Sequence, residues 1–243
     1  MKPVILKLCM ILASLMISLI SCTSKPGPLG EGIIKLDDFD FSTSISEILP
    51  ERYIHPDYGS DWFSVPSVCG PTLYHKETCC SYSTNEVLWL EYRYSSFCSG
   101  DEYLSMADRT FNAANFATTS DGRVFLASGK IEELTQTESD NFIAQLSKRY
   151  GEPIHTVESS FSDYDLYTWM LEDRTLKYAV IATDESNVLK IEMEHNEEGE
   201  LTDLREGKRN SYLIGYFFVI DAAWKDKFLT GDHMVSGDFC YCK

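Results

Sequence analysis

The chain has 243 residues, of which 44% are hydrophobic and 13% aromatic, and its formal net charge is −17 at pH 7. This composition supplies enough apolar side chains for a hydrophobic core and excludes an intrinsically disordered chain. The negative charge argues against a nucleic-acid partner, because the protein would repel a phosphate backbone.

The first 22 residues carry the most specific pattern in the sequence. Lys2 and Lys7 precede an apolar run of 13 residues, Leu8–Ile20. This length suits a secretory signal and is shorter than the ~20 residues that cross a bilayer. The four residues Leu19-Ile20-Ser21-Cys22 resemble the lipobox of bacterial lipoproteins, in which a small residue precedes the cysteine that receives the lipid. A plain hydrophobic anchor is the alternative.

The resemblance implies a signal peptide over residues 1–21, lipidation of Cys22 and attachment of the protein to a membrane through that lipid. Residues 22–32, rich in Pro and Gly, would form a flexible tether. Thr23 stands where an aspartate commonly marks inner-membrane retention in Gram-negative lipoproteins. The resemblance therefore implies an outer-membrane lipoprotein whose body faces the periplasm.

The mature chain is more acidic than the whole. Residues 1–21 contain two lysines and no acid, so 19 basic and 38 acidic residues remain and the formal charge becomes −19. Clustered acids would steer a basic protein partner toward the surface, whereas dispersed acids would only keep the domain soluble.

The body begins with short elements. Ile33–Leu36 is predicted to be a strand. The acidic stretch Asp37–Phe41 could hold calcium, but its alternating phenylalanines favour a strand edge with acids facing water. Ser44 and Glu47 have capping-box spacing and predict a short helix that Pro50 ends.

Prolines and glycines interrupt any hydrophobic period between Glu51 and Asn85, which predicts a long loop. Loops of this length are usually functional or held by disulfides, so its aromatic side chains are candidates for a recognition surface. The alternative is that these rings pack over a sheet beneath the loop. The candidates are Tyr53, Tyr58, Trp62, Phe63 and Tyr74.

Strands and helices are predicted to alternate through the middle of the chain. Period-two alternation indicates a strand, while apolar residues at three- and four-residue steps indicate a helix. The predicted elements are a strand at Val87–Tyr94, a helix from Ser99 to about Phe116, strands at Val124–Ala127 and Lys130–Leu134, and a helix from about Glu138 to Tyr150. Gly151 and Pro153 end the last helix.

Three consecutive strands with short turns predict an antiparallel meander after this helix. They are Tyr164–Leu171, Thr175–Ala182 and Val188–His195, followed by a charged connection at Asn196–Asn210 and a buried strand or core helix at Tyr212–Ala223. The order of helix, Lys-Arg-Tyr-Gly-x-Pro exit and meander resembles the helix-on-antiparallel-sheet units of many small envelope lipoproteins. That resemblance is architectural and implies no activity.

Six cysteines remain in the body when Cys9 and Cys22 are set aside: Cys69, Cys79, Cys80, Cys98, Cys240 and Cys242. In an oxidising compartment an even number favours disulfides. The close pairs at 79–80 and 240–242 do not easily bridge internally, so we expect the C-terminal tail to be stapled to the Cys69–Cys98 region. A metal site combining His75 or His233 with the paired cysteines is disfavoured, because the spacings match no usual zinc pair.

Catalytic motifs are missing from the sequence: it has no Gly-x-Ser-x-Gly elbow, no His-Glu-x-x-His and no phosphate-binding glycine loop. His55, His155 and Asp163 could assemble with a serine, and paired carboxylates could act on glycosides. The prediction is nevertheless a non-enzyme without cofactor or metal.

The patterns together predict an α+β fold over residues 33–243, with antiparallel meanders, helices packed on one face and disulfide-stapled loops. These residues would form a single body, and the alternative is a body of two lobes, at about 33–120 and 121–243. The expected function is a non-catalytic, membrane-anchored envelope lipoprotein with a binding or assembly role. The alternatives are an inhibitor or immunity protein against a basic secreted enzyme, and an envelope hydrolase.

Overall fold

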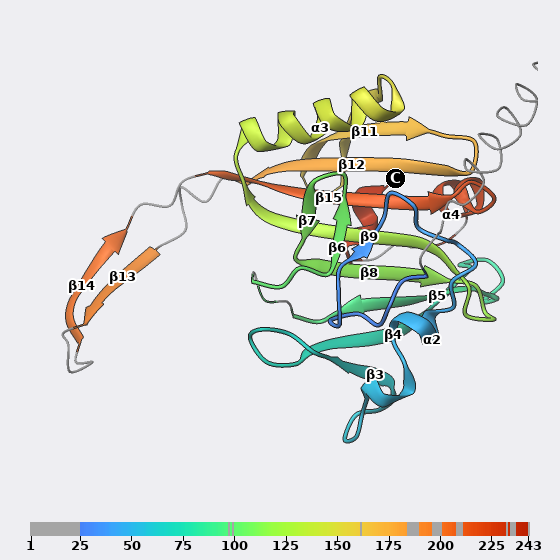
Figure 1. The fold of residues 1–243 in the computed structure, drawn as a ribbon, viewed down its shortest axis with the longest axis horizontal. Helices are drawn as coiled ribbons and strands as arrows, with labels where there is room; N and C mark the ends of the chain where they lie inside the picture. Colours follow the sequence, from blue (N-terminus) through green and yellow to red (C-terminus); the bar gives the residue numbers. More distant parts are fainter. Residues whose placement is uncertain are drawn as a thin grey trace, which may run out of the picture.

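Antiparallel strands make up most of the molecule (Figure 1). The structure, a computed structural model, describes residues 25–96, 98, 100–160, 162–183, 190–195, 201–207, 211–231, 233 and 237–242. The lipobox residues and the first three residues of the predicted tether, 22–24, lie outside this part. None of the helices in these ranges is long and apolar enough to cross a membrane.

The described strands form one large sheet, one small sheet and one isolated hairpin. The large sheet has ten strands, and each neighbouring pair is antiparallel. Its order is β10 (Ile154–Ser159), β11 (Asp163–Met170), β12 (Arg174–Thr183), β15 (Tyr212–Asp221), β9 (Val124–Leu134), β8 (Ala113–Thr118), β5 (Val87–Tyr94), β4 (Thr72–Cys80), β3 (Gly59–Val65) and β2 (Ile54–His55). The small sheet holds β1 (Ile34–Lys35), β6 (Leu104–Met106) and β7 (Arg109–Phe111), and the hairpin holds β13 (Lys190–His195) and β14 (Leu201–Gly207).

One longer helix, α3 (Gln136–Tyr150), and four short helical segments complete the described fold. The short segments are α2 (Ile45–Ile48), the 3-10 turn η1 (Glu51–Tyr53), α4 (Lys225–Thr230) and the 3-10 segment η2 (Gly237–Cys242). The capping box predicted at Ser44 and Glu47 is present at α2. Thr135 and Glu138 make the same reciprocal cap at α3, and Gly151 ends that helix with a φ of 88°. The prediction of the long helix is therefore confirmed, with its start two residues earlier.

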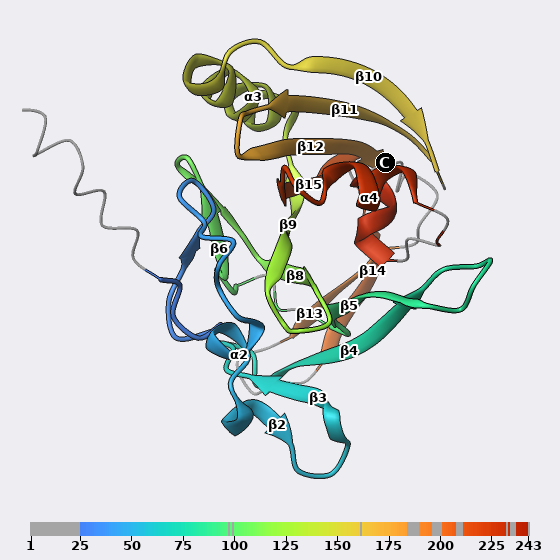
Figure 2. The ribbon, with the colours of Figure 1, turned by 90° about the vertical axis from the view of Figure 1, so that its right-hand side faces the viewer.

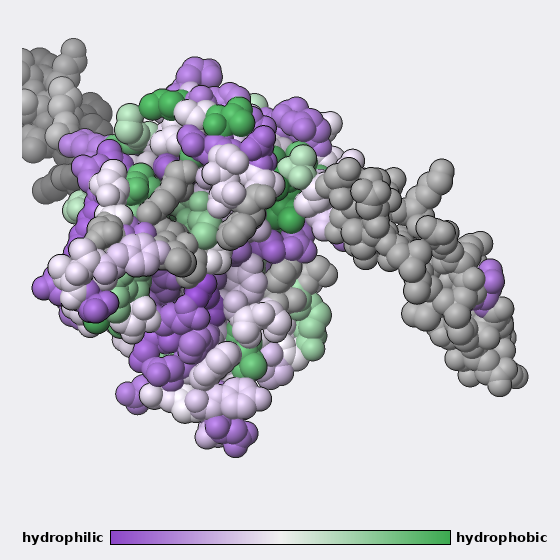
Figure 3. All heavy atoms as spheres, turned by 180° about the vertical axis from the view of Figure 1, so that it is seen from behind, coloured by the Kyte–Doolittle hydropathy of each residue, from purple (hydrophilic) through white to green (hydrophobic). Residues whose placement is uncertain are grey.

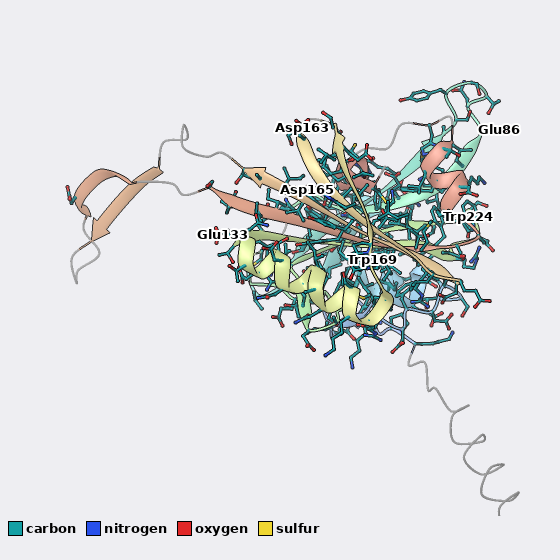
Figure 4. The ribbon with its side chains drawn as sticks, turned by 90° about the horizontal axis from the view of Figure 1, so that it is seen from above. Glu86, Glu133, Asp163, Asp165, Trp169 and Trp224 are labelled. Atoms are coloured by element: carbon teal, nitrogen blue, oxygen red, sulfur yellow. A yellow bond between two sulfur atoms is a disulfide. The ribbon has the colours of Figure 1, made fainter. Side chains whose placement is uncertain are left out.

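Two hydrophobic layers cover opposite faces of the large sheet. Successive side chains of a strand point to opposite faces, so Phe217 and Phe218 of β15 serve different layers. Phe217 contacts Phe142 of α3 at a ring-centroid distance of 5.7 Å, and Trp169 donates its indole N–H to the Gly151 carbonyl (Figure 4). On the other face, Phe218 belongs to a cluster that includes Phe228 of α4.

The prediction that helices pack on one face is therefore wrong. In Figure 2, α3 lies at the upper left of the sheet and α4 lies over its right-hand side. The N-terminal segment joins α3 on the first face, where Leu36 and Phe39 are buried in the same cluster as Phe142 and Leu146. The second face is closed by α4 and η2, whose Phe228 and Phe239 rings are fully buried.

Residues 51–85 hold strands β2, β3 and β4 rather than the predicted loop. The proline and glycine residues mark the turns between these strands: Pro56 follows β2, and Pro66, Gly70 and Pro71 lie between β3 and β4. The signals that suggested a loop thus belong to the corners of two hairpins.

The helix predicted from Ser99 to Phe116 is also wrong, because β6, β7 and β8 occupy this region. Every residue of β8 is buried, since the strand lies between β5 and β9 with both faces covered. A strand buried on both faces loses the period-two signal. The carboxylate of Asp101, just before β6, accepts the backbone N–H of Val68 at 3.0 Å.

The last third of the chain follows the prediction only in part. The pairing of β11 with β12 is confirmed, but the third predicted strand, β13, pairs with β14 instead of β12. β15 takes that place, so Tyr212–Asp221 is a strand. The predicted strands at Val124–Ala127 and Lys130–Leu134 are one strand, β9, and Asp37–Phe41 forms turns rather than a strand edge.

Candidate functional site

Three neighbouring strands bring polar and aromatic side chains together on the face of the sheet that α4 and η2 partly cover. The register places Trp62 of β3 opposite His75 of β4, and His75 opposite Arg93 of β5. One step along, Glu77 lies opposite Glu91. Because residues two apart in a strand share a face, these five side chains lie on one side of the sheet. In Figure 3, which shows the molecule from behind, hydrophilic side chains gather on the lower half of the body.

The aromatic members form a row of stacked and edge-on rings, defined here as His55, Tyr58, Trp62 and His75. Trp62 stacks on His75 with ring centroids 4.4 Å apart, and Tyr58 meets Trp62 edge-on at 5.8 Å. His55 stacks on Tyr58 at 4.1 Å. Tyr58 is 59% exposed, so the row runs outward from the sheet to solvent.

The charged members form a connected cluster beside this row, defined here as His75, Glu77, Glu91 and Arg93. The Nδ1 atom of His75 lies 3.2 Å from Glu77 Oε1, and the guanidinium of Arg93 makes an ion pair with the Glu77 carboxylate. Arg93 Nε is 3.6 Å from Glu91 Oε2. Arg93 therefore lies between two carboxylates, one of which also contacts His75.

Glu91 is the deepest member of the charged cluster and is only 2% exposed. Burial removes water from its carboxylate and raises its pKa to about 7, although the Trp89 indole N–H, at 3.0 Å from Oε1, acts in the opposite direction. Burial likewise lowers the pKa of Arg93.

The C-terminal segment η2 forms one wall over these strands. The carboxylate of Asp238 accepts the Tyr94 hydroxyl at 2.7 Å and the Asn115 side-chain N–H at 3.1 Å. Burial, followed by the nearby Asp238 charge, raises the pKa of Tyr94, so this hydroxyl stays a donor. Gly237 has a φ of 60°, and a Cβ there would lie 2.7 Å from Arg93 Nη1. A side chain at this position would therefore displace the guanidinium.

Between the sheet and η2 lies a cavity of about 300 Å³, called here the β3–β5 cavity. Its lining residues are Trp62, His75, Glu77, Arg93, Tyr94, Ser95, Asn115, Gly237 and Asp238. It joins the inner end of the ring row to the charged cluster.

A larger hollow of about 450 Å³ lies near the disulfide, but its chemistry is less suited to a ligand. Glycines, Pro66 and Val68 supply much of its lining. One oxygen of its buried carboxylate, Asp101, is already engaged with the Val68 backbone. We therefore regard the β3–β5 cavity as the candidate site.

The predicted recognition residues divide between the surface and the core. Tyr58 and Trp62 belong to the ring row, whereas Tyr53, Phe63 and Tyr74 are 5%, 7% and 0% exposed and belong to the hydrophobic core. For these three residues the alternative, packing over a sheet, is correct. Phe63 and Tyr74 point to the opposite face of the sheet from Trp62, and Tyr53 lies beneath the N-terminal segment, where its hydroxyl contacts Glu31. Sequence reasoning missed Glu77, Arg93, Asn115 and Asp238 as members of a common site. For Glu77 and Arg93 the only signal was the alternation of charged residues within β4 and β5, and Asn115 in β8 and Asp238 in η2 carried no signal.

Among the predicted disulfide cysteines, Cys69 and Cys98 are bonded to each other, with Cα atoms 5.9 Å apart. Neither of these two cysteines can therefore pair with Cys240 or Cys242 of the C-terminal tail. Cys79 and Cys242 are both buried in the second hydrophobic cluster, and Cys80 is exposed. Cys240, in η2, is partly exposed.

The structure does not bring together His55, His155 and Asp163. His55 lies in β2 and His155 in β10, at opposite edges of the ten-stranded sheet. His155 contacts Asp165 at 2.7 Å instead, and Figure 4 shows Asp163 and Asp165 at the sheet margin.

Comparison with known proteins adds no relative: no family model, curated protein or solved structure matches the chain. Within the described residues, no group of three or more His, Cys, Asp or Glu side chains could hold a metal ion. His75 and His233, considered as metal ligands, stack on Trp62 and lie edge-on to Trp89, respectively.

Proposed function

We propose that the protein is a non-catalytic, lipid-anchored binding protein of the bacterial cell envelope, which holds its ligand in the β3–β5 cavity. The observation that carries the proposal is the meeting of the ring row and the charged cluster in one hollow, under a wall fixed by Asp238. Ligand pockets typically combine aromatic walls with a few convergent polar groups. The motif ending at Cys22 supports the anchor, and residues 1–24 lie outside the described part.

The arrangement of the acids favours binding over hydrolysis. A glycoside hydrolase needs a carboxylic acid with a raised pKa that reaches the substrate. Glu91 has the raised pKa, but it lies beneath Arg93 and does not line the cavity. The acids that do line it, Glu77 and Asp238, are engaged with Arg93 and with Tyr94 and Asn115.

The anchor is tested by Cys22→Ser in the native host, with radioactive palmitate labelling and separation of membrane from periplasm. We expect the variant to lose the label and the body to be released into the periplasm. A labelled variant, or one that stays in the membrane fraction, would contradict the proposal. Ser21→Ala keeps a small residue before the cysteine and is the matched control.

The nature of the partner is tested by affinity capture with the purified chain at low and high salt. A basic protein that elutes with salt would support the alternative of an inhibitor, motivated by the −19 charge. Turnover of glycan or peptide libraries would support the hydrolase instead and contradict the non-catalytic proposal.

A further inference from the structure

The β3–β5 cavity is lined by hydrogen-bond donors and acceptors, which come from the strands on one side and from η2 on the other. Carboxylates such as those of Glu77 and Asp238 only accept hydrogen bonds, whereas the guanidinium of Arg93 only donates. Asn115 can do both. A ligand that satisfies this lining needs groups that donate and accept within a short distance of each other, and adjacent hydroxyl groups have this property.

The charges of the lining favour a neutral ligand. Glu77 is paired with Arg93 and contacts His75, and Asp238 accepts two hydrogen bonds from neutral side chains. An anionic ligand would be repelled by both carboxylates. A cationic ligand would be repelled by Arg93 and would have to compete with it for Glu77, with which it pairs, and for Asp238, which lies near it. A neutral ligand meets neither penalty.

The aromatic side of the cavity adds an apolar surface next to these polar groups. Trp62 lines the cavity, and the ring row continues from it to the exposed Tyr58. A pyranose ring matches this combination, since its C–H face is apolar while its edge carries hydroxyls. The volume, about 300 Å³, is at the low end of the ~300–1,000 Å³ found for ligand pockets, which suits a single ring better than a long buried chain.

We infer that the β3–β5 cavity binds one ring of a neutral sugar, with its hydroxyl groups on Asp238, Asn115 and Arg93 and its C–H face against Trp62. The exposed part of the ring row then offers a platform to a second, linked ring. This inference rests on the proposed binding function and names its ligand class.

The test measures sugar binding by the purified full chain in detergent solution, using isothermal titration calorimetry and tryptophan fluorescence. The neutral probes are glucose, N-acetylglucosamine and the β-1,4-linked trimer of N-acetylglucosamine; the charged probes are glucuronate and glucosamine. We expect saturable binding of at least one neutral probe, about tenfold tighter than that of its charged counterpart.

Trp62→Ala should weaken this binding about tenfold, because it removes the stacking surface. Tyr82→Ala is the matched control, since Tyr82 is as exposed as Tyr58 but lies in the β4–β5 turn outside the cavity, and it should leave affinity unchanged. Circular dichroism verifies the fold of each variant. If Trp62→Ala does not fold, Asp238→Asn provides the second variant, which keeps the side-chain size, removes a carboxylate that accepts from the sugar hydroxyls and should also weaken binding.

Absence of saturable binding to every neutral probe, tighter binding of a charged probe, or unchanged affinity in the folded cavity variants would each overturn the inference. Failure here leaves the anchoring result of Cys22→Ser and the outcome of protein capture unaffected. The ligand class and the proposed function can therefore fail separately.

Discussion

Thr183 at the end of β12 and Tyr212 at the start of β15 lie directly opposite each other, although they are 29 positions apart in the sequence. The Thr183 hydroxyl donates to the Tyr212 carbonyl at 2.9 Å. The β12–β15 ladder is thus continuous up to the point where the chain leaves the sheet, and β13 and β14 pair with each other beside the body (Figure 1). The β13–β14 hairpin is thus an insertion between β12 and β15, at a place where a tight turn could connect these two strands.

Replacing residues 184–211 by Asn-Gly should therefore leave the body folded. Asn-Gly favours the type I′ turn that joins antiparallel neighbours. A shorter loop also loses less conformational entropy when the protein folds. We expect the free energy of unfolding, measured by urea denaturation, not to fall and to rise by at most about 2 kcal/mol, since the loop is halved nearly four times.

Phe217→Ala in β15 is the reference for a substitution that damages the sheet. Its free energy of unfolding should fall by ~3–5 kcal/mol, because the side chain is fully buried. If the shortened chain loses as much stability as this variant, the segment takes part in the fold and the interpretation as an insertion is wrong.

Phe142→Ala should detach α3 from the sheet. The Phe142 ring contacts Tyr178 at 5.0 Å and Phe217 at 5.7 Å, and it is 3% exposed. Removing it leaves a cavity between helix and sheet, for which we expect a loss of about 3–5 kcal/mol in the free energy of unfolding. Chemical denaturation followed by circular dichroism gives this value.

Gln145→Ala, on the exposed side of the same helix, should change stability by less than about 0.5 kcal/mol. Equal effects of the two substitutions would show that α3 is not held by its buried face.

The elements that were predicted correctly are those specified by neighbouring residues. The cap at Thr135, the apolar stripe through Phe142 and the stop at Gly151 are all local, so the sequence was sufficient to define α3. For β8 the local pattern was misleading, because its burial on both faces depends on strands far along the chain.

The candidate site could not be predicted for the same reason. Trp62, His75 and Arg93 lie side by side only because of the register between β3, β4 and β5. Asp238 reaches them from the C-terminal end of the chain through its bonds to Tyr94 and Asn115. No spacing within the sequence contains this information.

Loss of the Cys69–Cys98 disulfide should destabilise the body without unfolding the sheet. The bond links the loop after β3 to the segment after β5, with 29 positions between the two cysteines. In the chain-entropy description, closing a loop of this size contributes about 3–4 kcal/mol. We expect this loss for the double variant Cys69→Ser/Cys98→Ser in urea denaturation.

Cys80→Ser changes an exposed thiol and is the matched control, with little expected effect on stability. Peptide mapping under non-reducing conditions identifies the bond directly. Recovery of Cys69 linked to any other cysteine would contradict the pairing.

The buried carboxyl of Glu91 should make stability depend on pH. Burial raises its pKa from 4.5 to about 7 in the folded protein, so between these values the folded state keeps a proton that the unfolded state releases. Raising the pH through this window therefore favours unfolding. The full shift corresponds to about 3 kcal/mol, an upper value because the ionised carboxylate would also be stabilised by Arg93, at 3.6 Å.

Glu91→Gln removes this titration while keeping an oxygen that can accept the Trp89 indole N–H. Relative to the unmodified protein, the variant should gain stability progressively between about pH 4.5 and pH 7, by up to about 3 kcal/mol. Urea denaturation across this range measures the difference, with the exposed Glu86→Gln as control. If the curves for Glu91→Gln and the unmodified protein run parallel, Glu91 is already ionised in the fold and Arg93 neutralises it.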